Sequence, residues 1–215
     1  MILTSVNIGK AEPIENAKSS GKTGIFKQPA TTAVDITAEG LAGDTICDKR
    51  NHGGVDQAVY LYGTADYDWW VSELGRALAP GTFGENLTIS DLVSTEYNIG
   101  DTFTIGTVQL QVTAPRIPCV TLSRRMDDAT FDKRFRDAER PGLYCRVLEP
   151  GAVQVGQAVV VARYTDETVS ALEMFRNFYK PNRSEANLRR YLAAPIAIRD
   201  RVVKERALRK LLERK

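Results

Sequence analysis

Short runs of alternating apolar and polar residues, separated by glycine-containing turns, extend from Met1 to about Ala162. In one run Val108, Leu110 and Val112 face one way and the residues between them face the other, the period of two of a half-buried strand. The runs are ILTSVNIG, TAVDIT, QAVYLYG, DTFTIG, VQLQVTAP, GLYCRVLEPG, AVQVG and AVVVA. Many short strands at this spacing predict a mainly β fold, an all-β barrel or a barrel-like sandwich.

One helix is predicted within this β-rich part. Thr64 is a suitable N-cap, and Asp66 follows in the first turn, where the positive end of the helix dipole favours a carboxylate. The apolar residues that then repeat at helical spacing are Tyr67, Trp70, Val71 and Leu74. We expect this helix to plug or cover the barrel with its aromatic side chains.

From residue 163 onward the hydrophobic period becomes helical. A first helix should end before Pro181, a second should begin at the N-cap Ser184, and a third should follow from about Pro195. Their apolar stripes are Val169, Leu172, Phe175 and Phe178, then Leu188 and Leu192, then Ile198, Val202, Leu208 and Leu211. The change of period predicts a β-barrel domain at residues 1–162 and a separable three-helix bundle at residues 163–215.

The composition is that of a soluble globular protein, since 43% of the 215 residues are hydrophobic and 26% are charged. No basic stretch precedes an apolar one at the N-terminus, and no window approaches the roughly 20 apolar residues of a membrane span. We therefore expect a cytoplasmic protein with no membrane partner. The net charge of +2 by itself argues neither for nor against nucleic acid, which is not expected as a partner. The basic residues of the tail are expected to form a solvated face, and the alternative is that they bind an anionic partner.

Three cysteines, an odd number in a chain without a secretory signal, argue against a disulfide framework. Cys145 shares an apolar face with Leu143 and Val147, so we expect it in the core. No role is assigned to Cys47. Cys119 has a different setting and is considered by itself.

Cys119 follows a proline directly, in TAPRIPCVTL, at the end of a predicted strand. Pro115 and Pro118 restrict the backbone on both sides of Arg116, so this segment is a rigid mount for a side chain. A nearby Arg116 would favour the thiolate, the form of cysteine that attacks electrophiles or binds metals. The alternative is that Cys119 is a small buried apolar residue, as free cysteine often is.

The segment EGLAGDTICDKRNHGG collects charged residues, glycines and the single histidine of the chain. Glycine-rich loops let the backbone approach a ligand and present N–H groups to anions, and neighbouring basic side chains add positive charge. The candidate binding residues here are Arg50, His52, Gly53 and Gly54. The alternative is a tight connection whose glycines only permit positive φ.

Asn86, in FGENLTI, is a further candidate. Its amide offers two donors and an acceptor, which suits a polar heterocycle such as a pterin. The alternative is a turn asparagine that bonds its own backbone.

A different combination joins Cys119 and His52 with either Asp56 or Asp44 as a cysteine-nucleophile triad. Zinc is not indicated, because no pair of cysteines or histidines has the spacing of zinc ligands. The sequence also has no Walker loop and no dinucleotide fingerprint.

Five segments, in this order, resemble a MOSC domain, the module named for the C-terminal part of molybdenum cofactor sulfurases. They are GLAGD, RNHGGVDQAVYLY, FGENLTI, IGDTFTIGTVQLQVTAPRIPCVTL and GLYCRVLEPGAVQVGQ. The resemblance covers most of residues 1–162, and the tail resembles the three-helix domain of the bacterial YiiM-like branch.

This resemblance implies a MOSC-type β-barrel that holds a molybdenum cofactor, molybdenum on molybdopterin, with Cys119 as catalytic residue and protein ligand to the metal. A thiolate is a soft donor, suited to a metal already held by dithiolene sulfurs. No pyridoxal phosphate is expected. The residues expected around the cofactor are Arg50, His52, Gly53, Gly54, Asn86 and Arg116.

The resemblance also implies an oxidoreductase that reduces the N–O bond of N-hydroxylated substrates, such as hydroxylaminopurine-type bases, and so detoxifies them. Electrons would come from a separate reductase, a flavin or iron–sulfur protein. Eukaryotic members have an additional N-terminal segment that helps hold the cofactor, and this sequence has no room for it. The first alternative is therefore a cofactor or sulfur carrier with a persulfide on Cys119. The second alternative is a cysteine-triad hydrolase, which needs no metal.

Overall fold

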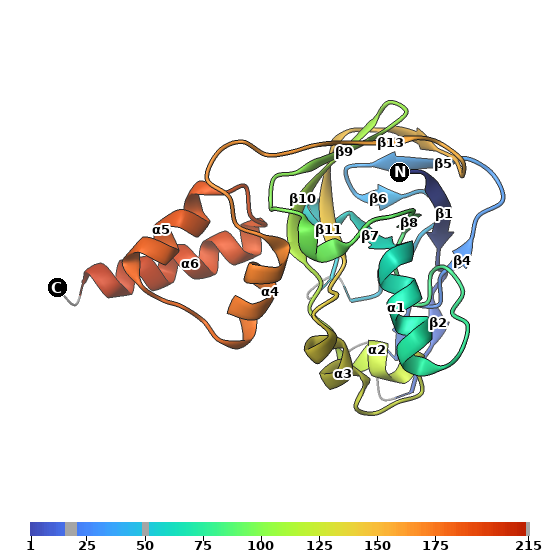
Figure 1. The fold of residues 1–215 in the computed structure, drawn as a ribbon, viewed down its shortest axis with the longest axis horizontal. Coiled ribbons are helices and arrows are strands. Elements are labelled where there is room, and N and C mark those ends of the chain that lie inside the picture. The colour runs from blue at the N-terminus through green and yellow to red at the C-terminus, as the bar shows by residue number, and fades with distance from the viewer. Residues whose placement is uncertain (16–20, 49–51, 214–215) are drawn as a thin grey trace.

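The computed structural model describes residues 1–15, 21–48 and 52–213 (Figure 1). In this part of the chain the largest sheet has eight strands, and only the pair β7 and β8 is parallel. From one edge to the other its strands are β13 (Val159–Ala162), β9 (Thr102–Ile105), β10 (Val108–Pro115), β11 (Leu143–Glu149), β7 (Val59–Gly63), β8 (Leu87–Ile89), β1 (Leu3–Ile8) and β4 (Gln28–Pro29).

Two smaller sheets complete the described strands. The first has the order β12 (Gly151–Val153), β5 (Val34–Thr37) and β6 (Gly40–Leu41). The second pairs β2 (Glu12–Pro13) with β3 (Lys22–Thr23). Every run predicted from alternation contains a strand, which confirms the period-two reading of the first part of the chain.

The prediction of a mainly β, barrel-type fold is confirmed only in part, because the sheet does not form a closed barrel. Across the described residues 31% are helical and 27% lie in strands, so the fold is mixed α and β. The start of β1 meets the start of β13 over a short stretch, through the bridge between Ile2 and Ala158 and the backbone hydrogen bond from Val159 N–H to the carbonyl of Met1. The same edge of β1 then pairs with β4 at Asn7 and Ile8, and the sheet therefore stays open.

Three helices accompany the sheet below its strands in Figure 1, where only one was predicted. They are α1 (Thr64–Leu74), α2 (Val120–Arg125) and α3 (Phe131–Ala138). An aromatic cluster joins them to the sheet, with Trp70 of α1 packed against Phe131 and Phe135 of α3 at ring-centroid distances of 5.0 and 6.0 Å. The short α2 and the strongly charged α3 lack a long apolar stripe, which is why periodicity alone missed them.

Helix α1 covers its predicted range with a different cap. Gly63 is the N-cap, and Thr64 is the first helical residue. The Thr64 hydroxyl accepts a hydrogen bond from the backbone N–H of Asp91 instead. Asp66 is buried and pairs with Arg140 at 2.7 Å, so it serves the core as well as the helix dipole.

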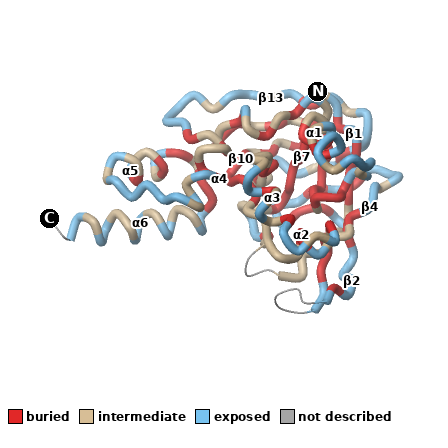
Figure 2. Tube along the Cα trace, turned by 60° about the horizontal axis from the view of Figure 1, so that its bottom comes forward, coloured by how far each residue is buried: buried red, intermediate tan, exposed pale blue. Residues whose placement is uncertain are grey.

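The three predicted tail helices are present as α4 (Ala171–Tyr179), α5 (Glu185–Ala193) and α6 (Ile198–Leu212). Ser184 caps α5, as predicted, by accepting a hydrogen bond from Asn187 N–H. Phe178, predicted on the apolar stripe of the first tail helix, is 58% exposed, and α6 has no buried residue (Figure 2). None of the helices among the described residues is long and apolar enough to cross a bilayer.

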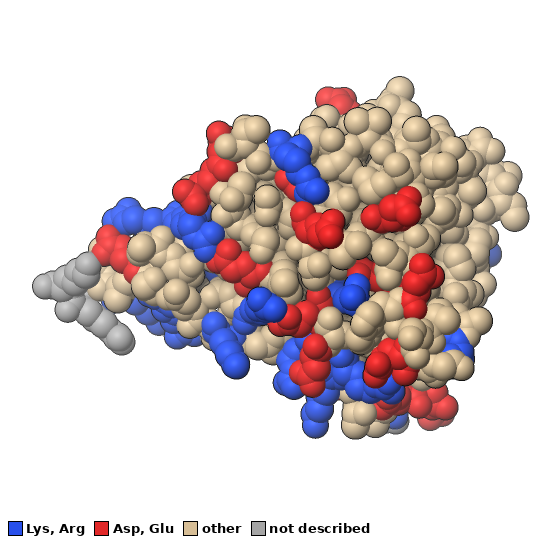
Figure 3. Space-filling view, in the orientation of Figure 1, with Lys and Arg blue, Asp and Glu red and all other residues tan. Residues whose placement is uncertain are grey.

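The tail packs on the sheet through α4, which lies between the strands and the other two helices (Figure 1). Tail residues belong to the same hydrophobic cluster as the inner face of the sheet. They are Val169, Ala171, Met174, Tyr191, Ala194, Ile196 and Ala197. Basic side chains gather along the outer part of the tail, where Arg206, Arg209 and Lys210 of α6 are exposed (Figure 3). The boundary between residues 162 and 163 stays a prediction.

Candidate functional site

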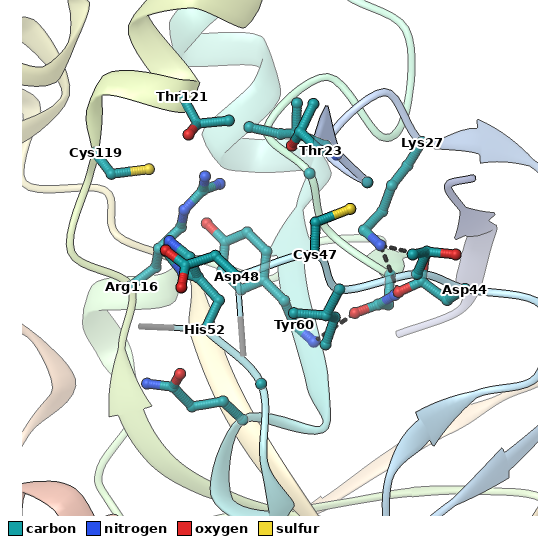
Figure 4. Close-up of a pocket in the computed structure, with 18 of the residues that line it drawn as sticks. Thr23, Lys27, Asp44, Cys47, Asp48, His52, Tyr60, Arg116, Cys119 and Thr121 are labelled. Atoms are coloured by element: carbon teal, nitrogen blue, oxygen red, sulfur yellow. Dashed lines mark hydrogen bonds and ion pairs between the residues drawn. The ribbon is translucent and has the colours of Figure 1, made fainter. Parts of the chain in front are cut away.

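Cys119 lies at the junction of β10 and α2. β10 ends at Pro115, and Cys119 is the N-cap of α2 with extended backbone angles. The two prolines before it hold this segment extended as it leaves the sheet. Its sulfur faces a cavity shared with Arg116 and His52 (Figure 4).

Two cavities meet at Cys119. The inner one has a volume of about 100 Å³ and extends toward Lys27 and Asp44. The outer one has a volume of about 480 Å³ and extends toward α4 and α6. The residues that line both are Asp48, His52, Gln57, Cys119, Thr121 and Tyr144.

The surroundings of Cys119 favour the thiolate. Burial opposes ionisation, but hydrogen bonding from His52 and the positive charge of Arg116 outweigh it and lower the pKa of Cys119 to about 6. Burial instead raises the pKa of Cys145, which is fully buried in the core as predicted. The thiolate is therefore favoured at Cys119 and disfavoured at Cys145, and His52 lies beside Cys119.

Arg116 forms a buried cationic wall of the inner cavity. Its side chain is only 4% exposed, and one guanidinium nitrogen, Nη1, donates a hydrogen bond to the carbonyl of Phe83. The guanidinium lies over the ring of Tyr60 at 5.2 Å from the centroid. Its Nε is buried with no hydrogen-bond partner, a cost that a bound acceptor would remove.

The far end of the inner cavity holds a buried ion pair between Lys27 and Asp44, whose side chains are 7% and 6% exposed. Burial lowers the pKa of Lys27, and the charge of Asp44 opposes that shift. Asn86 donates to Asp44 from Nδ2 at 2.9 Å and accepts the backbone N–H of Tyr60 at 3.1 Å. The Asn86 amide that was predicted to contact a heterocycle therefore orders the wall of the cavity.

Glycines let the backbone come close to the inner cavity. Gly53 lines it with a φ of 76°, and a Cβ there would lie 2.9 Å from Ile46 Cδ1. Gly84 lines it with a φ of 75°, and a Cβ there would lie 2.9 Å from Ile25 Cγ1. Gly54 has a φ of 82° and lines neither of these two cavities, and Arg50 lies outside the described residues.

The acids proposed for a cysteine triad are engaged elsewhere. Asp44 pairs with Lys27 and accepts the backbone N–H of Gly9 at 2.7 Å. Asp56 pairs with Arg146 at 2.9 Å. The structure thus places His52 beside Cys119, while Asp44 and Asp56 each form an ion pair with a different residue.

Several cavity residues were missed by sequence reasoning. They include Gly24, Lys27, Gln57, Tyr60, Gly84 and Tyr144. Tyr60 lies in β7 and Tyr144 in β11, within runs that were predicted as strands. The sequence gives no sign that these two side chains border a cavity. Gly84 is the exception, because it stands two residues before Asn86 in a segment already singled out.

The donor set fits a molybdenum cofactor. Within the described ranges no group of three or more His, Cys, Asp or Glu side chains could bind a metal ion. A metal held mainly by its own dithiolene needs from the protein only a soft ligand, which Cys119 supplies. The unpartnered Nε of Arg116 and the close glycine backbone suit an anionic, flat group in the inner cavity.

The sequence matches the MOSC domain over residues 48–160. The Bacillus subtilis (strain 168) protein YflK is 38% identical over 152 residues, which are 71% of this chain and 69% of YflK. The Escherichia coli (strain K12) protein YiiM is 31% identical over 169 residues, 76% of this chain and 74% of YiiM.

The fold agrees with these relationships. The crystal structure of YiiM from Geobacillus stearothermophilus superposes with a TM-score of 0.79 at 24% identity and covers 96% of this chain and 98% of that one. A segment of a Gibberella moniliformis protein named a reductase is 32% identical over 141 residues, 63% of this chain and 25% of that protein. From the matched domain and these relatives, the chain belongs to the MOSC domain family, in the branch that includes YiiM.

Proposed function

We propose that this protein binds a molybdenum cofactor through Cys119 and reduces N-hydroxylated compounds. One observation carries the proposal: Cys119 lies where a basic, glycine-lined inner cavity meets a larger outer cavity. Such an arrangement separates a place for a cofactor from a place for a substrate. The thiol between them is in contact with both.

The inner cavity would hold the pterin part of the cofactor. Arg116 brings a fixed positive charge and an unpartnered Nε, and Gly53 and Gly84, both with positive φ, form part of the cavity wall. Cys119 would bind the metal. When bound, the molybdenum centre supplies two-electron oxygen-atom transfer.

The net reaction would be R–NH–OH plus two electrons and two protons giving R–NH₂ and water. The N–O bond breaks, nitrogen keeps its one hydrogen and gains a second, and the hydroxyl takes up the other proton and leaves as water. The electrons would come from a separate reduced flavin or iron–sulfur protein. His52 borders the outer cavity beside Cys119, where it could hydrogen-bond to a bound substrate.

Relatives support a reductive role. The MOSC family is associated with the molybdenum cofactor, and a similar segment occurs in the Gibberella moniliformis protein named a reductase. A carrier of a Cys119 persulfide uses the same thiolate and is distinguished below by its lack of turnover. A hydrolase would show ester or amide cleavage without metal.

The test begins with protein made in a host that synthesises the molybdenum cofactor. We expect about one molybdenum per chain by elemental analysis, and reduction of 6-hydroxylaminopurine to adenine with a chemically reduced viologen as donor. In Cys119→Ser a hard, mostly protonated hydroxyl replaces a soft thiolate at nearly constant volume, so metal content and reduction should fall while the melting temperature changes little.

Cys145→Ala serves as the matched control, because it removes a thiol from the core and leaves the cavities intact. It should lower the melting temperature and retain metal and activity. Full reduction by Cys119→Ser would contradict the proposal. Metal-free esterase or amidase activity that depends on Cys119 would favour the hydrolase, and a stoichiometric, non-catalytic release of sulfur would favour the carrier.

A further inference from the structure

The outer cavity is built from two distant parts of the chain. On one side are the segment around Cys119 and the residues His52 and Tyr144 of the sheet region. On the other side the C-terminal tail contributes four side chains. These are Met174 and Phe178 of α4 with Arg199 and Asp200 of α6.

Hydrogen bonds fix the tail side of the cavity to the sheet region. Backbone N–H groups at the start of α6 bond to the sheet region, from Ala197 to the carbonyl of Thr113 at 3.1 Å and from Ile198 to Asp56 Oδ2 at 2.6 Å. Met174 belongs to the main hydrophobic core. The wall formed by α4 and α6 is therefore a fixed part of the cavity.

Phe178 has no role in the core. It was predicted on the apolar stripe of the first tail helix, and it is 58% exposed and borders the outer cavity. Ile117, Pro118 and Met174 add further apolar surface to the same cavity. Apolar side chains of this kind suit the face of a flat ring.

Asp200 is the acidic group of this wall. Burial raises its pKa, while the charges of Lys204 and Arg199 oppose the shift. A carboxylate that is partly withdrawn from water makes stronger hydrogen bonds than one in bulk solvent. It can accept from N–H donors on the edge of a heterocycle.

We propose that the tail determines which substrate is reduced: Phe178 and Met174 contact the face of a flat nitrogen heterocycle, and Asp200 accepts hydrogen bonds from its N–H edge. The substrates would be N-hydroxylated aminopurines and similar cyclic amidines. Acyclic hydroxylamines lack both the ring face and the N–H edge and would bind weakly. This specificity rests on the proposed function for its reaction, and its binding step can be measured without turnover.

The test compares Asp200→Asn and Phe178→Ala with the parent protein. Adenine, the reduction product of 6-hydroxylaminopurine, is the binding probe in isothermal titration calorimetry, and 6-hydroxylaminopurine and N-methylhydroxylamine are the assayed substrates. Each substitution should weaken adenine binding by about tenfold and raise KM for the purine to a similar extent, with kcat nearly unchanged. Neither should change KM for N-methylhydroxylamine.

Glu205→Gln is the matched control, since it removes an acidic group from an exposed position of α6 that does not line the outer cavity. It should bind adenine as the parent does. If the parent binds adenine through Asp200 but reduces neither substrate, the inference about ring recognition is supported and the proposed reductase function is contradicted. Parent-like adenine binding and KM in both Asp200→Asn and Phe178→Ala, or no adenine binding by the parent, would overturn the inference.

Discussion

The carboxylate of Asp56 accepts a hydrogen bond from the backbone N–H of Ile198 at 2.6 Å, across 142 positions of the sequence. The same carboxylate pairs with Arg146 at 2.9 Å. Arg146 also donates to the carbonyls of Pro195 and Ile196, just before α6, at 3.1 and 3.2 Å. The segment after His52, strand β11 and the start of α6 therefore form one hydrogen-bonded unit beside the outer cavity.

Asp56→Ala should destabilise the fold by about 2 kcal/mol, because Arg146 loses its ion pair and the N–H of Ile198 loses its acceptor. The Asp56 side chain is 13% exposed, so water replaces it poorly. Urea denaturation measures the change. Asp137→Ala is the control, since its carboxylate is 67% exposed and its pair with Arg136 is screened by solvent, so the change in stability should be small. Equal effects of the two substitutions would show that the Asp56 contacts do not anchor α6.

Alkylation of Cys119 in metal-free protein should follow a pKa near 6. The thiolate is the reactive form, so the rate with iodoacetamide should rise as pH increases through about 6 and level off above it. His52→Ala removes a hydrogen bond that favours the thiolate and should move the midpoint to higher pH. Peptide mass spectrometry follows each thiol separately, and Cys145 should remain unmodified because it is buried. A midpoint near that of a free thiol in the parent would contradict this picture.

Arg116→Met should reduce cofactor retention by tenfold or more, since it removes the buried charge while keeping a long side chain over Tyr60. Pterin content, read from the fluorescence of the oxidised pterin after denaturation, measures the loss independently of turnover. Arg116→Lys keeps the charge and loses the planar hydrogen-bonding group, so it should retain an intermediate amount. Parent-like pterin content in Arg116→Met would show that this cation does not hold the cofactor.

A chain that ends at Thr165 should keep strand-type circular dichroism and lose stability. The removed tail contributes Met174, Tyr191 and Ile196 to the main core, so their loss exposes the apolar surface of the sheet that they cover. We expect a lower melting temperature and binding of a hydrophobic dye. An unchanged melting temperature would mean that the barrel-like part is an independent domain, and complete unfolding would mean that there is a single core.

Local pattern was sufficient for the longer strands and for most helices of the described residues, and it did not single out the two-residue strands β2, β3, β4 and β6. Alternation depends only on neighbours within a few residues, and it located every strand run that was predicted. Helix α5 was also located from local pattern, because Ser184 caps its N-terminus. Helices α2 and α3 were missed because their stability comes from long-range aromatic packing, as between Trp70 and Phe135.

The sequence by itself also singled out the central thiol. Prolines on either side of Arg116 fix the backbone locally, so Cys119 could be recognised as a mounted side chain without knowledge of the fold. It could not show that His52 would lie beside that thiol, because nothing local specifies the path of the chain between them. The pairing of the two was open in the sequence and was settled by the fold.

Only the tertiary structure decided whether the sheet closes, what the candidate acids do and what forms the outer wall. Closure depends on which strand occupies the second edge of β1, and β4 takes that place at Asn7 and Ile8. Asp56 had been a candidate triad acid, and it instead anchors the start of α6. Such choices depend on which distant groups compete for the same hydrogen bonds and the same buried surface, and that competition exists only once the chain has folded.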